Sequence, residues 1–164
     1  MTIWTHLNTQ RTLKTRLLGI DLGDKTIGLA LSDRTWQIAT PLQTLARHAQ
    51  ALDILKKLIH DENIAGIIIG LPVNMNGTEG PQALKTRAFA DTLQADPDLS
   101  AIPVVFWDER LSTSAVTRTL ITGNASRRKR DRVVDKLAAS YILQGALDRL
   151  VQERTTAETD TSLV

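Results

Sequence analysis

One acidic residue stands inside an apolar strand pattern near the start of the chain. Residues 17–22 read Leu-Leu-Gly-Ile-Asp-Leu, turn at residues 23–25 and return as a second apolar run, which predicts a β-hairpin with Asp21 on its first strand. A carboxylate in a half-buried strand needs a hydrogen bond or a cation, because its desolvation is otherwise costly. Asp21 is therefore a candidate for chemistry. The alternative is that Asp21 only caps the turn.

Two other places supply acids that could meet Asp21. Asp108 and Glu109 follow an apolar run at residues 103–107. Strand parity puts them on opposite faces, so only one of them can point toward Asp21, and the sequence does not choose between them. Asp135 lies in the first turn of a predicted helix. An acid there complements the helix dipole, and on the residues alone this structural explanation is favoured.

Converging carboxylates without cysteine or histidine partners suit a hard cation, Mg²⁺ or Mn²⁺, rather than zinc. The chain has no cysteine, and its three histidines are scattered. Paired ions of this kind activate water and stabilise the leaving oxygen in phosphodiester cleavage. Arg110 and the basic run of Arg127, Arg128, Lys129 and Arg130 would hold flanking phosphates. The reaction that fits is nucleic acid hydrolysis.

The apolar periodicity predicts the elements that position these residues. Strands are expected near residues 16–22, 26–32, 36–39, 65–70 and 103–107, and helices near residues 47–60, 82–94, 112–121 and 133–151. A parallel crossover from the first helix onto the hairpin is the economical topology. Ligands usually bind at the carboxyl ends of parallel strands, where Asp108, Glu109 and the loop at residues 71–81 would lie.

Length and charge indicate one α/β domain with an anionic partner. For the 164 residues we expect a flexible leader that packs little at residues 1–15, a domain at residues 16–151 and a frayed polar tail at residues 152–164. The net charge is only +2, but residues 1–16 hold three basic residues and no acid, and residues 127–132 hold five basic residues. This pattern favours a nucleic acid partner; solvated, partly disordered segments are the alternative.

The apolar runs are too short for a bilayer, and no continuous apolar segment opens the chain. We therefore expect neither secretion nor membrane insertion, and the cytoplasm as the compartment. Without cysteine, neither a disulfide framework nor a thiolate zinc site is possible.

Four separated segments together resemble one known family. They are Gly19-Ile-Asp-Leu-Gly with Ile27-Gly-Leu-Ala-Leu-Ser-Asp33, Gly70-Leu-Pro-Val-Asn-Met-Asn-Gly-Thr-Glu-Gly80, Trp107-Asp-Glu-Arg-Leu-Ser-Thr113, and Asp135-Lys-Leu-Ala-Ala139 with Ile142-Leu-Gln144. In this order they are similar to the bacterial YqgF or RuvX family, known as pre-16S rRNA nucleases and as Holliday junction resolvases. The resemblance covers about residues 17–150, and four ordered motifs are more specific than any one alone.

The resemblance implies a ribonuclease H-like fold: a mixed five-stranded sheet, with strands one to three antiparallel and strands four and five parallel to strand one, flanked by helices. It implies a Mg²⁺- or Mn²⁺-dependent endonuclease for structured nucleic acid. Its role would be 5′-end processing of pre-16S rRNA, with ribosomal precursor particles as further partners. By motif, the catalytic and metal-binding acids would be Asp21, Glu109 and Asp135. For Asp135, the resemblance therefore favours a catalytic role over the explanation by the helix dipole.

The chain departs from the family pattern at two places. Thr26 stands where many members have arginine, which removes one phosphate contact. Leu71 and Pro72 follow the fourth predicted strand, where many ribonuclease H-like nucleases have an acid. This second departure leaves open whether two metal ions bind.

Two rival functions share these features. The Asp-x-Gly hairpin also looks like the phosphate-binding strand pair of the actin and sugar-kinase ATPases, but those enzymes need two such domains and this chain has room for one. The more serious rival is an RNA-binding or ribosome-assembly factor without cleavage. The sequence also leaves open RNA against branched DNA as the substrate, and a monomer against a homodimer.

Overall fold

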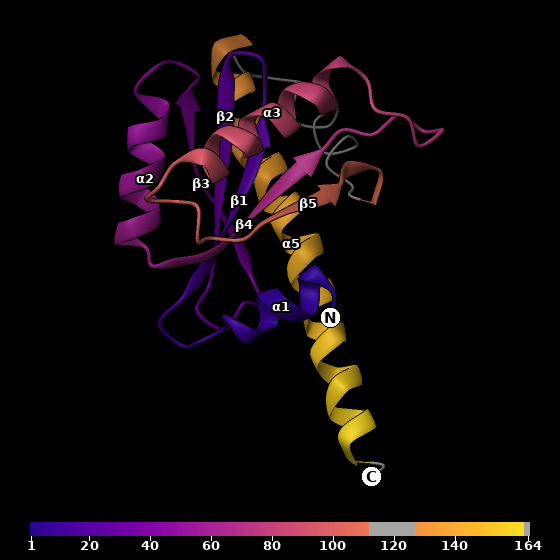
Figure 1. Ribbon diagram of the computed structural model, residues 1–164. Helices are drawn as coiled ribbons and strands as arrows, with labels where there is room; N and C mark the ends of the chain where they lie inside the picture. Colours follow the sequence, from indigo (N-terminus) through magenta and orange to yellow (C-terminus); the bar gives the residue numbers. More distant parts are fainter. Residues whose placement is uncertain (112–126, 163–164) are drawn as a thin grey trace.

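The computed structural model describes residues 1–111 and 127–162, without the side chains of residues 127–134. A five-stranded sheet with helices on both faces forms its centre (Figure 1). α2 (Ala51–Asp61) and α3 (Pro81–Ala95) cover one face, and α1 (Ile3–Thr9) with α5 (Arg127–Ser162) covers the other. The helix predicted at residues 112–121 lies outside the described residues.

The strands follow the order β3-β2-β1-β4-β5 across the sheet. Their bounds are β1 (Arg16–Leu22), β2 (Thr26–Ser32), β3 (Ala39–Ala46), β4 (Ile64–Leu71) and β5 (Val104–Asp108). β1 to β3 pair antiparallel, whereas β1, β4 and β5 run parallel. This is the predicted ribonuclease H-like arrangement, and it brings the carboxyl ends of β1, β4 and β5 to one edge.

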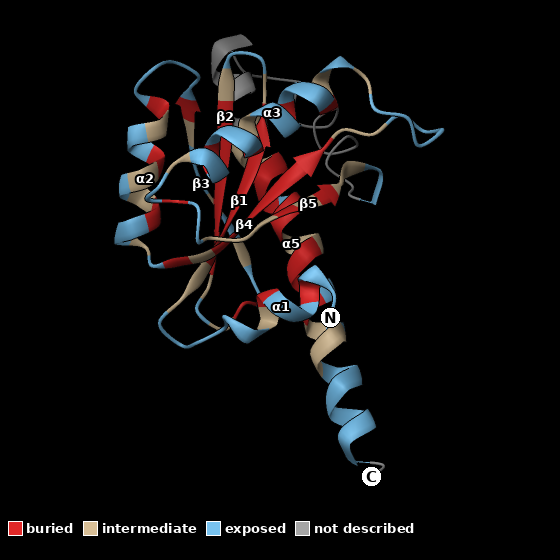
Figure 2. Ribbon diagram, viewed as in Figure 1, coloured by how far each residue is buried: buried red, intermediate tan, exposed pale blue. Residues whose placement is uncertain are grey.

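β1 and β4 are apolar along almost their whole length because helices cover both of their faces (Figure 2). Leu18 and Ile20 belong to the core under α2 and α3, whereas Leu17 belongs to the core under α5. Gly19 lies against Leu143 of α5. Because side chains alternate along a strand, Asp21 has the parity of Leu17 and faces α5.

The third strand lies further along the chain than predicted. β3 begins at Ala39, where the prediction ended it, and includes Pro41. An edge strand accepts proline because one side of its backbone has no neighbouring strand, and the register shifts between Leu29 and Ala30 opposite this stretch. Trp36 lies instead in the turn before β3, with a φ of 58° and a fully buried ring.

The first residues pack onto the domain, so the prediction of a leader with few contacts was wrong. They form α1, whose Trp4 and Leu7 are buried. The ring of Trp4 meets that of Trp107 edge to face, with centroids 6.0 Å apart. Helix α1 has only 7 residues, too few for apolar periodicity to reveal it.

The last helix is longer at both ends than the predicted 133–151. α5 includes the basic run at residues 127–132 and also residues 152–162, which were expected to fray. The predicted helix ended where the apolar periodicity ended. Residues 127–162 contain no proline and a single glycine, Gly145, so they hold no strong signal that would end a helix. The final turns are exposed and project beyond the sheet (Figure 2).

The other elements lie close to their predicted positions. α2, α3, β4 and β5 each begin and end within four residues of the predicted bounds. Across the part of the chain that the structure describes, no helix has both the length and the apolar character needed to span a membrane.

One carboxylate organises the turn between β2 and β3. Asp33 accepts hydrogen bonds from the backbone N–H groups of Gln37 (2.8 Å), Ile38 (2.9 Å) and Thr35 (3.2 Å), and from the Thr35 hydroxyl. Partial burial raises the pKa of Asp33, but these donors outweigh it and lower the pKa to about 2.

We expect Asp33→Ala to lower the free energy of unfolding by about 2 kcal/mol at neutral pH, since a pKa lowered from 3.8 to about 2 favours the folded state by roughly that amount. Because the folded pKa is the lower one, this contribution is complete above about pH 4 and is lost as the pH falls toward 2. Urea unfolding at both ends of that range measures it, with the exposed Asp160→Asn as control. An equal loss at both pH values would contradict the prediction.

Candidate active site

Asp21 lies near the carboxyl end of β1 and is only 4% exposed. Its partner across the antiparallel ladder is Gly28 of β2. On the other side Ile20 pairs with Ile69 of β4, so the next residues along these parallel strands, Asp21 and Gly70, are neighbours. Asp21 therefore stands between two glycines that leave open room on the face toward α5.

Asp135 fills the room above Gly28. A Cβ atom added to Gly28 would lie 2.2 Å from the carbonyl oxygen of Asp135 and 3.0 Å from its Cβ atom, so the α5 backbone rests directly on β2. The hydroxyl of Thr26 donates a hydrogen bond to Oδ2 of Asp135. Since α5 begins at Arg127, Asp135 lies about two turns inside the helix, and the explanation by the helix dipole was wrong.

Glu109 fills the room above Gly70. A Cβ atom added to Gly70 would lie 2.6 Å from Oε1 of Glu109 and 2.5 Å from Cδ1 of Ile142 in α5. β5 ends at Asp108, and Glu109 begins a single 3-10 turn, η1 (Glu109–Leu111). The structure thus answers the question that strand parity left open: Glu109 lies on the same face as Asp21.

Asp108 has a different environment. Its carboxylate accepts hydrogen bonds from Nη2 (2.6 Å) and Nε (3.0 Å) of Arg110. The Arg110 side chain, together with the Arg110 backbone N–H, holds the pKa of Asp108 below its usual value despite partial burial. Nη1 of Arg110 also donates to the carbonyl oxygens of Asn74 (3.5 Å) and Met75 (3.4 Å). Arg110 therefore joins the end of β5 to the loop after β4; its predicted phosphate contact stays a prediction.

The three acids share one face at one edge of the sheet, and their oxygens are ligands that Mg²⁺ and Mn²⁺ accept. Among the described residues, however, no group of three or more acids or histidines is arranged to hold a metal ion. Asp21, Glu109 and Asp135 are gathered around two glycines, Gly28 and Gly70.

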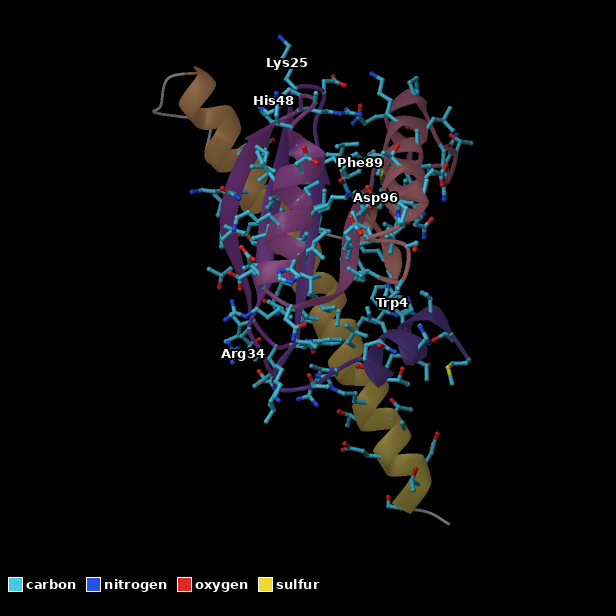
Figure 3. All side chains as sticks on the ribbon, turned by 60° about the vertical axis from the view of Figure 1, so that its left-hand side comes forward. Trp4, Lys25, Arg34, His48, Phe89 and Asp96 are labelled. Atoms are coloured by element: carbon cyan, nitrogen blue, oxygen red, sulfur yellow. The ribbon has the colours of Figure 1, made fainter. Side chains whose placement is uncertain are left out.

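The predicted phosphate-binding run, Arg127, Arg128, Lys129 and Arg130, forms the first turn of α5, and its side chains lie outside the description. In Figure 1 this end of α5 lies at the same end of the sheet as the turn between β1 and β2. Figure 3 shows Lys25, a residue of that turn, at the same end of the molecule as the start of α5. The backbone therefore puts this basic run at the same end of the domain as Asp21.

Sequence reasoning missed three residues that build this site. Gly28 and Gly70 were not singled out, although a glycine inside a strand signals a close backbone approach. Thr26 was noted only as an absent arginine, whereas its hydroxyl binds Asp135. The two glycines carried a readable signal; the Thr26 contact, which joins residues 109 positions apart, did not.

A sheet of this order, with helices on both faces and acids on one face at its strand ends, has the ribonuclease H-like fold. The profile of a family described as "RuvX: Holliday junction resolvase" matches residues 15–149. The chain belongs to the RuvX family, as the four motifs indicated.

Curated relatives match most of the chain. A protein named "Putative pre-16S rRNA nuclease" from Rhodobacter capsulatus is 52% identical over 136 residues, which are 82% of this chain and 84% of the relative. A relative of the same name from Methylocella silvestris is 56% identical over 137 residues, 82% of this chain and 83% of the relative. A solved structure, T. thermophilus RuvC in complex with Holliday junction substrate, matches with a TM-score of 0.48 and 16% identity over 83% of this chain and 96% of that chain. The family assignment does not depend on this weak likeness.

Proposed function

We propose that the chain is a metal-dependent endonuclease that hydrolyses phosphodiester bonds in the 5′-end processing of pre-16S rRNA, in the cytoplasm, during ribosome biogenesis. One observation carries the proposal: Asp21 is buried between Gly28 and Gly70, and Asp135 and Glu109 lie against those glycines. The names of relatives at 52% and 56% identity support the substrate.

In this proposal Asp21, Glu109 and Asp135 hold Mg²⁺ or Mn²⁺. The donor set fits a hard cation, because it consists of carboxylate oxygens alone. When bound, such an ion lowers the pKa of a water molecule and stabilises charge on the leaving oxygen. Glu109 lies over Gly70 at the end of β4, so it supplies a carboxylate where Leu71 follows without an acid.

The chain's own residues orient these carboxylates. The Thr26 hydroxyl fixes one oxygen of Asp135. The pair of Asp108 and Arg110 holds the turn in which Glu109 lies. Burial of Asp21 strengthens its interaction with a cation, because charges interact more strongly where water is scarce.

We expect Thr26→Val to weaken Mn²⁺ binding about tenfold, as the loss of a residue that orients a metal ligand typically does. Valine keeps the shape of threonine but cannot donate a hydrogen bond to Asp135. Thr26→Ser, which keeps the hydroxyl, is the matched control. Isothermal titration with Mn²⁺ measures the difference; equal affinities for both variants would contradict the role of Thr26.

The basic run at the start of α5 is proposed to bind phosphates beside this site, together with Arg110. We expect replacement of Arg127, Arg128 and Arg130 by alanine to weaken RNA binding. The slope of log K against log salt should fall in magnitude by about 3, because the protein would make three fewer phosphate contacts and binding would therefore release fewer counterions. Fluorescence anisotropy across a salt series measures this. An unchanged slope would remove the run from the interface.

Branched DNA is the second candidate substrate, because the matching family is described as Holliday junction resolvases. Paired cuts in a symmetric junction favour a symmetric dimer, whereas trimming of rRNA requires only a monomer. Ribosomal precursor particles are a proposed partner in the rRNA case alone. Oligomeric state during cleavage therefore separates the two candidates.

The decisive experiment compares cleavage of a precursor carrying the 5′ flank of 16S rRNA with cleavage of a four-way DNA junction. Both are incubated with wild type and Asp21→Asn in Mg²⁺, in Mn²⁺ and in EDTA. We expect metal-dependent cuts in the RNA by wild type alone. Faster cleavage of the junction than of the RNA would indicate that branched DNA is the substrate. Binding without any cut would leave a non-cleaving assembly factor.

A further inference from the structure

A second group of cations gathers at the end of the sheet away from Asp21. Its members come from three separate segments, and we call it the distal cluster: Arg11, Lys14, Arg34 and Arg154. Figure 3 shows Arg34 at the opposite end of the sheet from Lys25, which lies in the turn after β1. Residues 1–16 hold three basic residues and no acid, and the candidate active site uses none of them.

Specific contacts bring these segments together. Nε of Arg11 donates to the carbonyl oxygen of Thr35, so Arg11 lies beside the turn that presents the exposed Arg34. The donor and acceptor are 3.2 Å apart. From α5, Nη1 of Arg154 donates to Oδ1 of Asn8 at 3.0 Å, which places it beside α1 and the segment that carries Arg11. Tertiary structure thus collects cations that are up to 143 positions apart.

Two acids at this end of the sheet are engaged with other groups. The carboxylate of Asp33 accepts hydrogen bonds inside its own turn, from Gln37 at 2.8 Å and Ile38 at 2.9 Å among others. Glu62 pairs with Arg16, with Oε2 and Nη1 at 3.3 Å. Neither carboxylate is directed at the distal cluster. Glu158 of α5 acts on Arg154, but one carboxylate cannot balance four cations, so the cluster keeps a net positive charge.

The cluster also holds like charges close together. Burial and the positive charge of Arg11 lower the pKa of Arg154, against an opposing effect of Glu158. A phosphate bound between two such guanidinium groups would relieve their repulsion and accept charge-assisted hydrogen bonds.

We propose that the distal cluster binds the phosphate backbone of the same nucleic acid whose scissile bond lies at Asp21. This inference rests on the proposed function and adds a second contact to it. Membrane lipids also carry phosphates, but only an extended polyanion can reach both ends of the sheet at once. The nucleic acid would therefore lie along the domain.

Strand geometry sets the length of nucleic acid required. β1 connects the two ends, and the five steps from Arg16 to Asp21 span roughly 17 Å at about 3.3 Å per residue. One duplex turn covers about 34 Å in about ten base pairs, so the second contact needs about five base pairs of flank or more. The affinity for shorter nucleic acids should therefore not depend on the distal cluster.

The test measures binding rather than cleavage, in the Asp21→Asn background, with hairpin RNAs whose stems have about 3 and about 16 base pairs, so that only the longer stem can span both ends. We expect Lys14→Gln with Arg34→Gln to weaken binding of the longer RNA on the order of tenfold and to reduce its salt slope by about 2. Binding of the shorter RNA should not change. Both side chains are exposed, so the thermal midpoint should stay constant; if it falls, Arg34→Gln alone repeats the test.

The control is Lys56→Gln with Lys57→Gln, which removes the same number of positive charges, two, from α2. Equal effects of the two pairs, or equal effects on both RNA lengths, would overturn the proposal. So would lost binding to anionic phosphatidylglycerol vesicles with RNA binding intact, which would indicate a membrane contact. If the parent protein binds neither RNA, the proposed function itself fails, and that outcome is distinct from unchanged binding by the variant.

Discussion

Asp21→Asn is expected to slow metal-dependent cleavage by about a thousandfold or more, a loss of at least about 4 kcal/mol in transition-state stabilisation. Asparagine keeps the size of aspartate and an oxygen acceptor, but it removes the negative charge that a divalent ion needs. Asp21 is 4% exposed, so a water molecule cannot easily replace the lost carboxylate oxygen. Single-turnover cleavage of the rRNA precursor measures the rate.

Stability should respond in a different way. Thermal unfolding without metal gives the baseline midpoint of each protein. With Mn²⁺ at about one hundred times its dissociation constant, wild type should gain about 2.7 kcal/mol, and the variant should not. Asp24→Asn, in the exposed turn three residues later, is the matched control. A variant that loses stability but still cleaves would reduce Asp21 to a structural residue.

Gly28→Ala is expected to disrupt both the fold and the site. Its new Cβ atom would lie 2.2 Å from a backbone oxygen of α5, and a backbone atom cannot turn aside as a side chain can. We expect a loss of about 3 kcal/mol in the free energy of unfolding, as overpacked cores show. The shift of α5 would carry Asp135 with it, and a displacement of about 1 Å can reduce the rate about a hundredfold.

Gly80→Ala provides the comparison, because no atom of the described residues would lie closer than 3.7 Å to its added Cβ atom. It should cost less than about 1 kcal/mol, since Gly80 is only the N-cap of α3. Urea unfolding and single-turnover rates are measured for both variants. Similar stability in the two would show that α5 does not need the close approach at Gly28.

Much of the fold could be predicted from local patterns. The hairpin of β1 and β2 and the apolar β4 were visible because their periodicity is local. β3 was predicted too early in the chain and α1 was not predicted at all, since an edge strand that contains Pro41 and a helix with two buried residues carry weak local signals. α5 was predicted too short because the polar residues at both of its ends give no apolar periodicity, although polar residues can continue a helix.

The sequence by itself determined the class of the protein: the order of its elements, its carboxylates and its four motifs led to the family that the comparisons then showed. Only the tertiary structure decided which acid accompanies Asp21. Glu109 and Asp135 lie beside it because Gly70 and Gly28 leave room for them, and these contacts join segments far apart in the chain. Local patterns are set by neighbouring residues, whereas such a site depends on which strands and helices pack together.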